Sequence, residues 1–244
     1  MRSQRTVVAV VGLGVAGSLA AVHLCDGVSN HPQGVPIELL LVDPGLDTGA
    51  VGSAPDSGRH QLETPAEDLS CFDGDSEHFA RWLCRRGECP SRADLPPTWY
   101  RYRTYLAHTV GESIIQANGI ATVRRIRSRV EEFGTTDESG VVLYLDSGEV
   151  CRVDSVVLAT GPRYAWVRAD GDRWMSRPVD GATPDAVPCC ARPESRDGEM
   201  DVEPPVYSLS NCPDTCSSGP ADQVSRLRRE AETVAVAVLA GKAP

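Results

Sequence analysis

The feature that most constrains the fold is a glycine pattern near the start of the chain, in the stretch VVAVVGLGVAG at residues 7–17. Branched apolar residues precede Gly12, Gly14 and Gly17, which have the spacing G-x-G-x-x-G. The first glycine permits a tight turn, the second lets the backbone approach a pyrophosphate, and the third lets the next helix pack on the strand. The pattern predicts a dinucleotide-binding turn if a strand precedes it and a helix follows.

The flanking sequence supplies that context. Residues 6–12 are typical of a buried strand, residues 15–26 of a helix, and residues 37–43 of a second buried strand that ends at Asp43. A helix N-terminus offers free N–H groups to a pyrophosphate, and an acid at the end of the second strand can accept hydrogen bonds from ribose hydroxyls. Because Asp43 disfavours a 2′-phosphate, NADP fits this turn less well than FAD or NAD.

Periodic patterns continue along the rest of the chain. We expect helices over 76–86 and 99–118, a last helix between Pro220 and Gly241, and three strand-like runs within 121–159. Residues 163–205 are rich in Pro, Gly, Asp and Arg, which predicts an irregular segment. The alternation of strands and helices predicts an α/β fold.

Charge and cysteine content exclude several classes of protein. The formal net charge of −10 disfavours nucleic acid or an anionic membrane as a partner, and no apolar run is long enough to cross a bilayer. We therefore expect a cytoplasmic protein whose nine cysteines mostly stay reduced. Neither Cys189-Cys190 nor Cys212-x-x-x-Cys216 has C-x-x-C spacing, so we expect free thiols there and no metal, with a redox disulfide as a lesser alternative.

A second motif narrows the fold. The stretch VDSVVLATG at residues 153–161 resembles the ATG segment of two-dinucleotide-fold flavoproteins, in which a returning strand ends close to FAD. The last helix is similar to the one that closes their FAD domains. The resemblance implies a Rossmann-like FAD-binding domain with a small antiparallel β insertion.

A narrower likeness lies between these motifs. Residues 60–83 and 100–106 resemble bacterial FAD/NAD(P)-binding proteins related to the lysine and ornithine N-hydroxylases. The matching residues are Leu62, Pro65, Ala66, Ser70, Phe79, Trp82 and Leu83. The sequence departs from the pattern of these proteins in two places. Glu63 stands where they often have asparagine. Residues 163–205 are too few for their nicotinamide-binding domain and hold no second glycine motif. We thus predict an FAD domain over 1–162 and 206–244, with 163–205 replacing the second domain.

The function expected from this resemblance is that of an FAD-dependent oxidoreductase, monooxygenase-like or oxidase-like, acting on a small molecule. The alternatives are a non-catalytic or partner-dependent FAD-binding subunit, and an NAD-dependent enzyme. NAD(P)H is a possible transient reductant, and a reductase or partner subunit a possible electron source. The candidates beside the flavin ring are Arg59, His60 and Glu63. The predicted cofactor site consists of Gly12, Gly14, Val15, Ala16, Gly17, Asp43, Pro44, Val130, Thr160 and Gly161.

Overall fold

The computed structural model of the chain describes ten stretches of it. They are residues 5–30, 36–46, 62, 64–88, 97–136, 140–161, 164–170, 173–178, 206–209 and 220–240.

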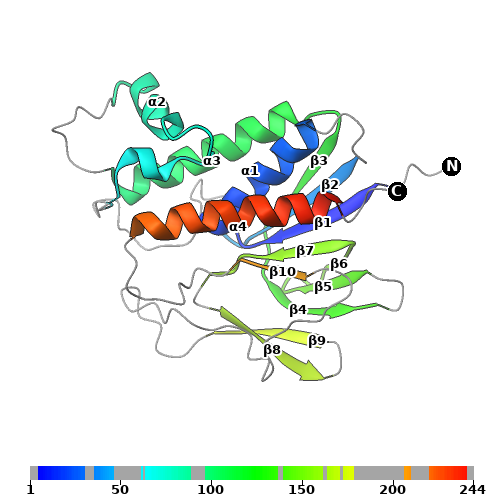
Figure 1. Ribbon diagram of the computed structural model, residues 1–244. Helices are drawn as coiled ribbons and strands as arrows, with labels where there is room; N and C mark the ends of the chain where they lie inside the picture. The colour runs from blue at the N-terminus through cyan, green and yellow to red at the C-terminus, as the bar shows by residue number, and fades with distance from the viewer. Residues whose placement is uncertain are drawn as a thin grey trace.

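A five-stranded parallel sheet forms the middle layer (Figure 1). Its strands lie in the order β10-β7-β1-β2-β3, and every neighbouring pair is parallel. Their bounds are Val206–Ser208 for β10, Ser155–Leu158 for β7, Thr6–Val11 for β1, Ile37–Val42 for β2 and Ala121–Ile126 for β3. β1 and β2 are buried at five of their six positions, as expected of parallel strands covered on both faces.

β1 is the central strand of this sheet. The chain leaves β1 towards β2 and β3 on one side and returns later to place β7 on the other. Such a reversal of strand order is a topological switch point, and in open α/β sheets ligands bind there, beyond the carboxyl ends of the strands. We therefore expect a ligand to bind at the edge where β1 and β7 end.

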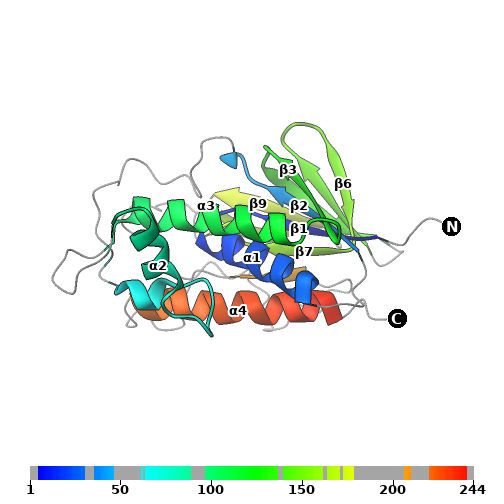
Figure 2. The same cartoon turned by 90° about the horizontal axis from the view of Figure 1, so that it is seen from above.

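Helices cover one face of the parallel sheet. α1, α3 and α4 lie side by side over it, and α1 is the middle one of the three (Figure 2). Their bounds are Val15–Asn30, Trp99–Gln116 and Pro220–Ala240. A 3₁₀ helix η2 (Ala66–Leu69) and the short helix α2 (His78–Arg85) lie at one end of this layer.

An antiparallel sheet covers the opposite face (Figure 1). Its strand order is β6-β5-β4-β9-β8. The bounds are Val150–Val153 for β6, Val141–Leu145 for β5, Val130–Thr135 for β4, Arg173–Pro178 for β9 and Tyr164–Asp170 for β8. Its inner face, which includes Phe133, Trp166 and Trp174, packs against the parallel sheet through a second apolar core. The molecule thus has three layers.

The α/β fold and all the expected helices are confirmed, with α1 running four residues further than expected. Two expectations were wrong. The three strand-like runs expected within 121–159 are five strands, because the chain changes sheet at Ser128 between β3 and β4 and again at Asp154 between β6 and β7. The first part of the segment 163–205 is not irregular, since β8 and β9 form an antiparallel pair there. The division into domains itself stays a prediction.

The cysteines of the described stretches differ in state. Cys25, Cys71 and Cys151 are free, as expected. Cys84 is disulfide-bonded, which the sequence did not predict. Cys189, Cys190, Cys212 and Cys216 lie outside the described residues. None of the helices described has a stretch sufficiently long and apolar to traverse a bilayer.

Candidate functional site

The glycine turn joins β1 to α1 at the carboxyl edge of the parallel sheet. Gly12 has φ +90°, a conformation that side chains rarely adopt, and a Cβ on it would lie 2.5 Å from the carbonyl oxygen of Ala159. A Cβ on Gly17 would lie 1.8 Å from the carbonyl oxygen of Gly12. Both glycines are therefore required by the protein's own packing, one by the turn and one by the contact between helix and strand.

Gly14 differs from its two neighbours. A Cβ on Gly14 would meet no atom within 4 Å, so its lack of a side chain leaves open space at the start of α1. The protein's own packing gives no reason for a glycine there. A ligand that approaches the backbone closely does give one.

The N-terminus of α1 faces this open space with unused hydrogen-bond donors. The first intrahelical bond of this turn runs from the Ser18 amide to the Gly14 carbonyl at 3.0 Å. The amides of Val15, Ala16 and Gly17 precede it and have no partner within the helix. The first turn carries no acidic side chain, and the helix dipole favours an anion there.

Asp43 lies directly after β2, beside the same turn. One carboxylate oxygen accepts a hydrogen bond from the Leu13 amide at 2.7 Å, and the other accepts one from the Gly45 amide at 2.7 Å. Each oxygen keeps a second lone pair, which is available to a hydroxyl group. Asp43 therefore holds the turn in place and remains able to accept from a ribose.

The end of β7 completes the site on the other side of β1. The Ala159 amide donates to the Val11 carbonyl at 2.8 Å, which keeps the two strand ends together. Thr160 and Gly161 follow, half-buried, and Gly161 has φ +73°. The structure thus brings these two residues to the edge that carries the glycine turn, as the resemblance implies.

Pro44 and Val130 lie towards β3. The Pro44 carbonyl accepts from the Arg127 guanidinium at 3.4 Å. Val130 begins β4, and its side chain is 2% exposed within the second core, so only its backbone is available to a ligand. These positions extend the edge beyond Asp43, on the side of β3.

The residues present fit a dinucleotide. The open space at Gly14, the free amides of α1 and the carboxylate of Asp43 supply a place for a pyrophosphate and an acceptor for ribose hydroxyls. The binding role of each residue is a prediction. Among the described residues, no group of three or more His, Cys, Asp or Glu side chains is placed to hold a metal.

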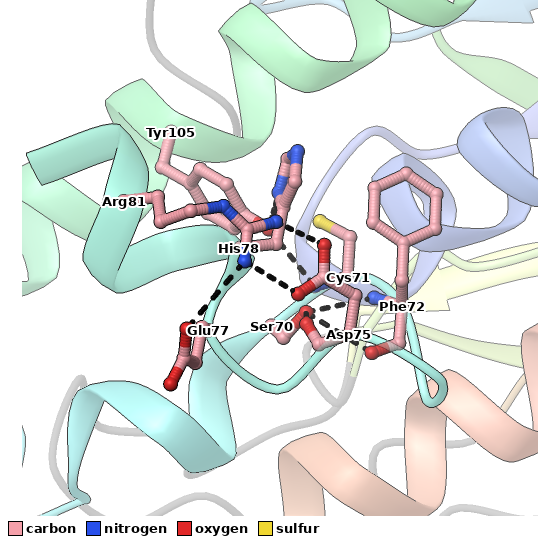
Figure 3. A network of polar contacts seen from close by, with 8 residues as sticks. All are labelled: Ser70, Cys71, Phe72, Asp75, Glu77, His78, Arg81 and Tyr105. Atoms are coloured by element: carbon pink, nitrogen blue, oxygen red, sulfur yellow. Dashed lines mark hydrogen bonds and ion pairs between the residues drawn. The ribbon is translucent and has the colours of Figure 1, made fainter. Parts of the chain in front are cut away.

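The candidates for the flavin ring, Arg59, His60 and Glu63, lie outside the described residues. Just after them, a polar network that the sequence did not indicate fixes residues 70–78 to α3 (Figure 3). The hydroxyl of Tyr105 accepts from the Cys71 amide at 3.0 Å and contacts His78 Nδ1 at 2.7 Å. We assign the hydrogen of that hydroxyl to His78 Nδ1, since the hydroxyl then both accepts one bond and donates one. Tyr105 is 27 positions from His78 and 34 from Cys71, and no pattern in the sequence pairs residues so far apart.

The rest of this network ties the loop to itself and to α4. The Ser70 hydroxyl donates to the Asp75 carbonyl at 2.6 Å, and Arg81 forms an ion pair with the Asp75 carboxylate (Figure 3). From α4, the largely buried Arg228 donates to the Ser70 carbonyl at 3.2 Å and to the Asp73 carboxylate at 2.5 Å. The loop that follows the candidate residues is therefore anchored on two helices.

The comparison with protein families shows which family the chain belongs to. The model of the FAD-NAD(P)-binding family matches residues 9–163, which is 155 of its 244 residues. The chain belongs to the FAD-NAD(P)-binding family. The match spans the glycine turn, Asp43 and the ATG segment. Membership in the FAD-NAD(P)-binding family confirms the predicted cofactor at the level of FAD and NAD(P), but it does not test the narrower likeness to lysine and ornithine N-hydroxylases.

Solved structures that match about two thirds of this chain include two monooxygenases and a disulfide reductase, each of them longer than this chain. Cyclohexanone monooxygenase has a TM-score of 0.43 at 18% identity, over 66% of this chain and 28% of that one. Steroid monooxygenase bound to NADP has a TM-score of 0.41 at 20% identity, over 66% and 26%. Bacillithiol disulfide reductase from Staphylococcus aureus has a TM-score of 0.41 at 15% identity, over 66% and 39%. At these TM-scores and sequence identities, the similarity does not indicate the reaction or the substrate of this chain.

The chain therefore matches well under half the length of each of these structures. A comparison with curated protein sequences finds no match.

Proposed function

We propose that this chain is an FAD-dependent oxidoreductase that acts on a small molecule. The observation that carries the proposal is the open space at Gly14, between the free amides of α1 and the carboxylate of Asp43, at the switch point of the sheet. FAD, when bound, supplies electron and hydride transfer at its isoalloxazine ring. The likeness to N-hydroxylases adds a hypothesis about the reaction class, a monooxygenase-like or oxidase-like one.

The residues of the chain would divide the binding between them. The amides of Val15, Ala16 and Gly17 hold the pyrophosphate, and Asp43 accepts from the ribose. Thr160 and Gly161 line the passage towards the ring, where Arg59, His60 and Glu63 remain candidates for proton transfer. The loop at residues 70–78, which follows these candidates in the sequence, is anchored by Tyr105 and Arg228.

The alternative is a partner-dependent or non-catalytic FAD-binding subunit. The segment 163–205 favours it, because it is too short for a nicotinamide-binding domain and holds no second glycine motif. If the chain is such a subunit, a reductase or partner subunit supplies the electrons. If the chain is an oxidoreductase by itself, the substrate or a transiently bound NAD(P)H supplies them.

The test begins with the visible spectrum of the purified chain, before and after addition of FAD and removal of the excess. Flavin absorbance that stays with the protein supports the proposal, and a chain that takes up no FAD contradicts it. Anaerobic addition of NADH or NADPH then separates the alternatives. Bleaching by either nucleotide alone supports direct reduction, whereas a yellow chain that neither these nucleotides nor any of a panel of small substrates bleaches supports the subunit.

A matched pair of variants tests the position of the pyrophosphate. Gly14→Leu fills space that no protein atom uses, so the variant keeps its fold, but it should weaken FAD binding by about 100-fold, or ~2.7 kcal/mol. Gly111→Leu is the control, because a Cβ there also meets no atom within 4 Å and the residue lies in α3, away from the turn. Equal affinity in both variants would place the pyrophosphate elsewhere.

A further inference from the structure

Exposed apolar side chains gather on the outer face of the antiparallel sheet. Tyr144, Val150, Val167 and Met175 are 37–54% exposed. In the described part of the chain, the other large apolar side chains of this kind are on helices: Tyr100, Ile115 and Val236. Scattered exposed apolar residues are ordinary on a protein surface, whereas a contiguous group is typical of an interaction site.

The strand register places these four residues in one row. Val150 pairs with Tyr144, Tyr144 with Glu132, Glu132 with Met175, and Met175 with Val167. Side chains of directly paired residues lie on the same face of a sheet. The row therefore crosses all five strands, β6-β5-β4-β9-β8, with a carboxylate at its centre.

The centre of the row carries both signs of charge. Glu132 forms an ion pair with Arg173, whose guanidinium also lies 5.7 Å from the centre of the Tyr144 ring. Arg173 pairs with Gly134, so it lies on the same face of the sheet as Glu132 and Met175. Glu132 is 17% exposed and Arg173 60% exposed, so the arginine remains accessible at the middle of the face.

From either end, the row presents the same kinds of side chain in the same order. A valine comes first, then a large side chain (Tyr144 or Met175), then the charged Glu132, then the other large side chain and a valine. A two-fold axis along β4 places Val150 of one copy over Val167 of the other, and Tyr144 over Met175. It also places Glu132 of one copy over Glu132 of the other, and the two carboxylates then share two guanidinium groups, one Arg173 from each copy. Such self-complementarity is what an isologous interface requires.

We propose that a second copy of this chain docks face to face on this sheet. The charge at the centre balances across the interface, and each methionine sulfur meets a tyrosine ring, which is a favourable contact. The arrangement is independent of whether FAD is bound. It assigns the outer sheet to assembly and leaves the carboxyl edge of the parallel sheet to the cofactor.

The oligomeric state of the full chain tests the proposal, measured by analytical ultracentrifugation over a range of concentrations. We expect a dimer that Met175→Glu weakens by about tenfold or more, because each copy buries an added charge. Ile115→Glu changes an equally apolar and more exposed residue on α3 and leaves the dimer unchanged. A monomer at all concentrations, or a dimer that is insensitive to Met175→Glu while circular dichroism shows a folded variant, overturns the proposal.

Cross-linking tests the arrangement without relying on a destabilising charge. In the double variant Tyr144→Cys with Met175→Cys, the two positions of one chain are separated by β4, too far apart for a disulfide. Only the two-fold pairing brings them together, so oxidation should join two chains through residues 144 and 175, identified by mass spectrometry. Tyr144→Cys alone should not cross-link. No link in the double variant, or a link in the single one, contradicts the two-fold pairing.

Discussion

The carboxylate of Asp43 accepts a hydrogen bond from the backbone amide of Leu13 at 2.7 Å. The residue expected to meet the ribose thus also holds the middle of the glycine turn. Binding and folding are therefore coupled at this acid, and a variant of Asp43 should change both.

Asp43→Asn tests this double role. The amide oxygen replaces only one of two acceptors, so the Leu13 or the Gly45 amide loses its partner, at a cost of about 1–3 kcal/mol in the free energy of unfolding. FAD affinity should also fall, by about tenfold, because a charge-assisted bond to the ribose is lost. Chemical denaturation and FAD titration measure the two effects.

Asp154→Ala is the control, because it removes the acceptor of a single backbone amide. Asp154 accepts from the Val7 amide at 2.7 Å, near the opposite end of β1, far from the turn. This variant should lose stability without losing FAD affinity. If both variants lower FAD affinity equally, the effect of Asp43 comes from stability alone.

Gly17→Ala should unfold more easily than the unchanged chain. Its methyl group would lie 1.8 Å from the Gly12 carbonyl oxygen, which is backbone and can move only if the turn moves. We expect a loss of about 3 kcal/mol in the free energy of unfolding, at the upper end for an overpacked site. Urea denaturation measures it. A stable Gly17→Ala variant would mean that α1 sits further from β1 than described.

Acidification should destabilise the chain through His78. Burial lowers the pKa of His78, and the Asp75 carboxylate only partly opposes this. Between the lowered pKa and 6.5, the unfolded chain binds more protons than the folded one, so stability is full above about pH 6.5 and falls below it. Protonation of Nδ1 would also remove the acceptor of the Tyr105 hydroxyl.

His78→Asn separates this residue from other titrating groups. Burial also lowers the pKa of His23, so some loss of stability below pH 6.5 should persist in the variant. Denaturation at pH 7 and pH 5 should therefore show a smaller pH effect in His78→Asn than in the unchanged chain. An identical effect in both would mean that His78 titrates normally.

Two buried thiols should resist alkylation in the folded chain. Burial raises the pKa of Cys25 and of Cys71 to about 12, and the thiolate is the reactive form. Iodoacetamide at neutral pH should modify neither until the chain is unfolded in urea, as peptide mass spectrometry can show. Rapid labelling of either in the native chain would indicate local opening of the helical layer.

The parts of the fold that depend on local sequence were predictable. The glycine turn, β2 and the helices α3 and α4 follow from apolar periodicity and turn residues that lie close together in the chain. The carboxyl edge that gathers Gly12, Asp43 and Gly161 was predictable only with the family resemblance, because nothing in the spacing says that β7 lies beside β1.

The remaining differences have physical causes. Ser128 is an unremarkable residue in a run of alternating side chains, so the change of sheet at that point left no signal. In β8 and β9 the buried Trp166 and Trp174 alternate with exposed residues, but arginine and aspartate dominate the composition around them. The contacts of Tyr105 with Cys71 and His78 join segments that only the tertiary fold brings together.

The order of the strands also has a consequence for biosynthesis. β1 leaves the ribosome well before its neighbour β7, because the partners Val8 and Ser155 are 147 positions apart. Until then one edge of an apolar strand is unpaired, which is a condition that favours aggregation and slows folding. A nascent chain that ends before residue 155 should therefore depend on chaperones, whereas a chain that includes β7 can pair both edges of β1.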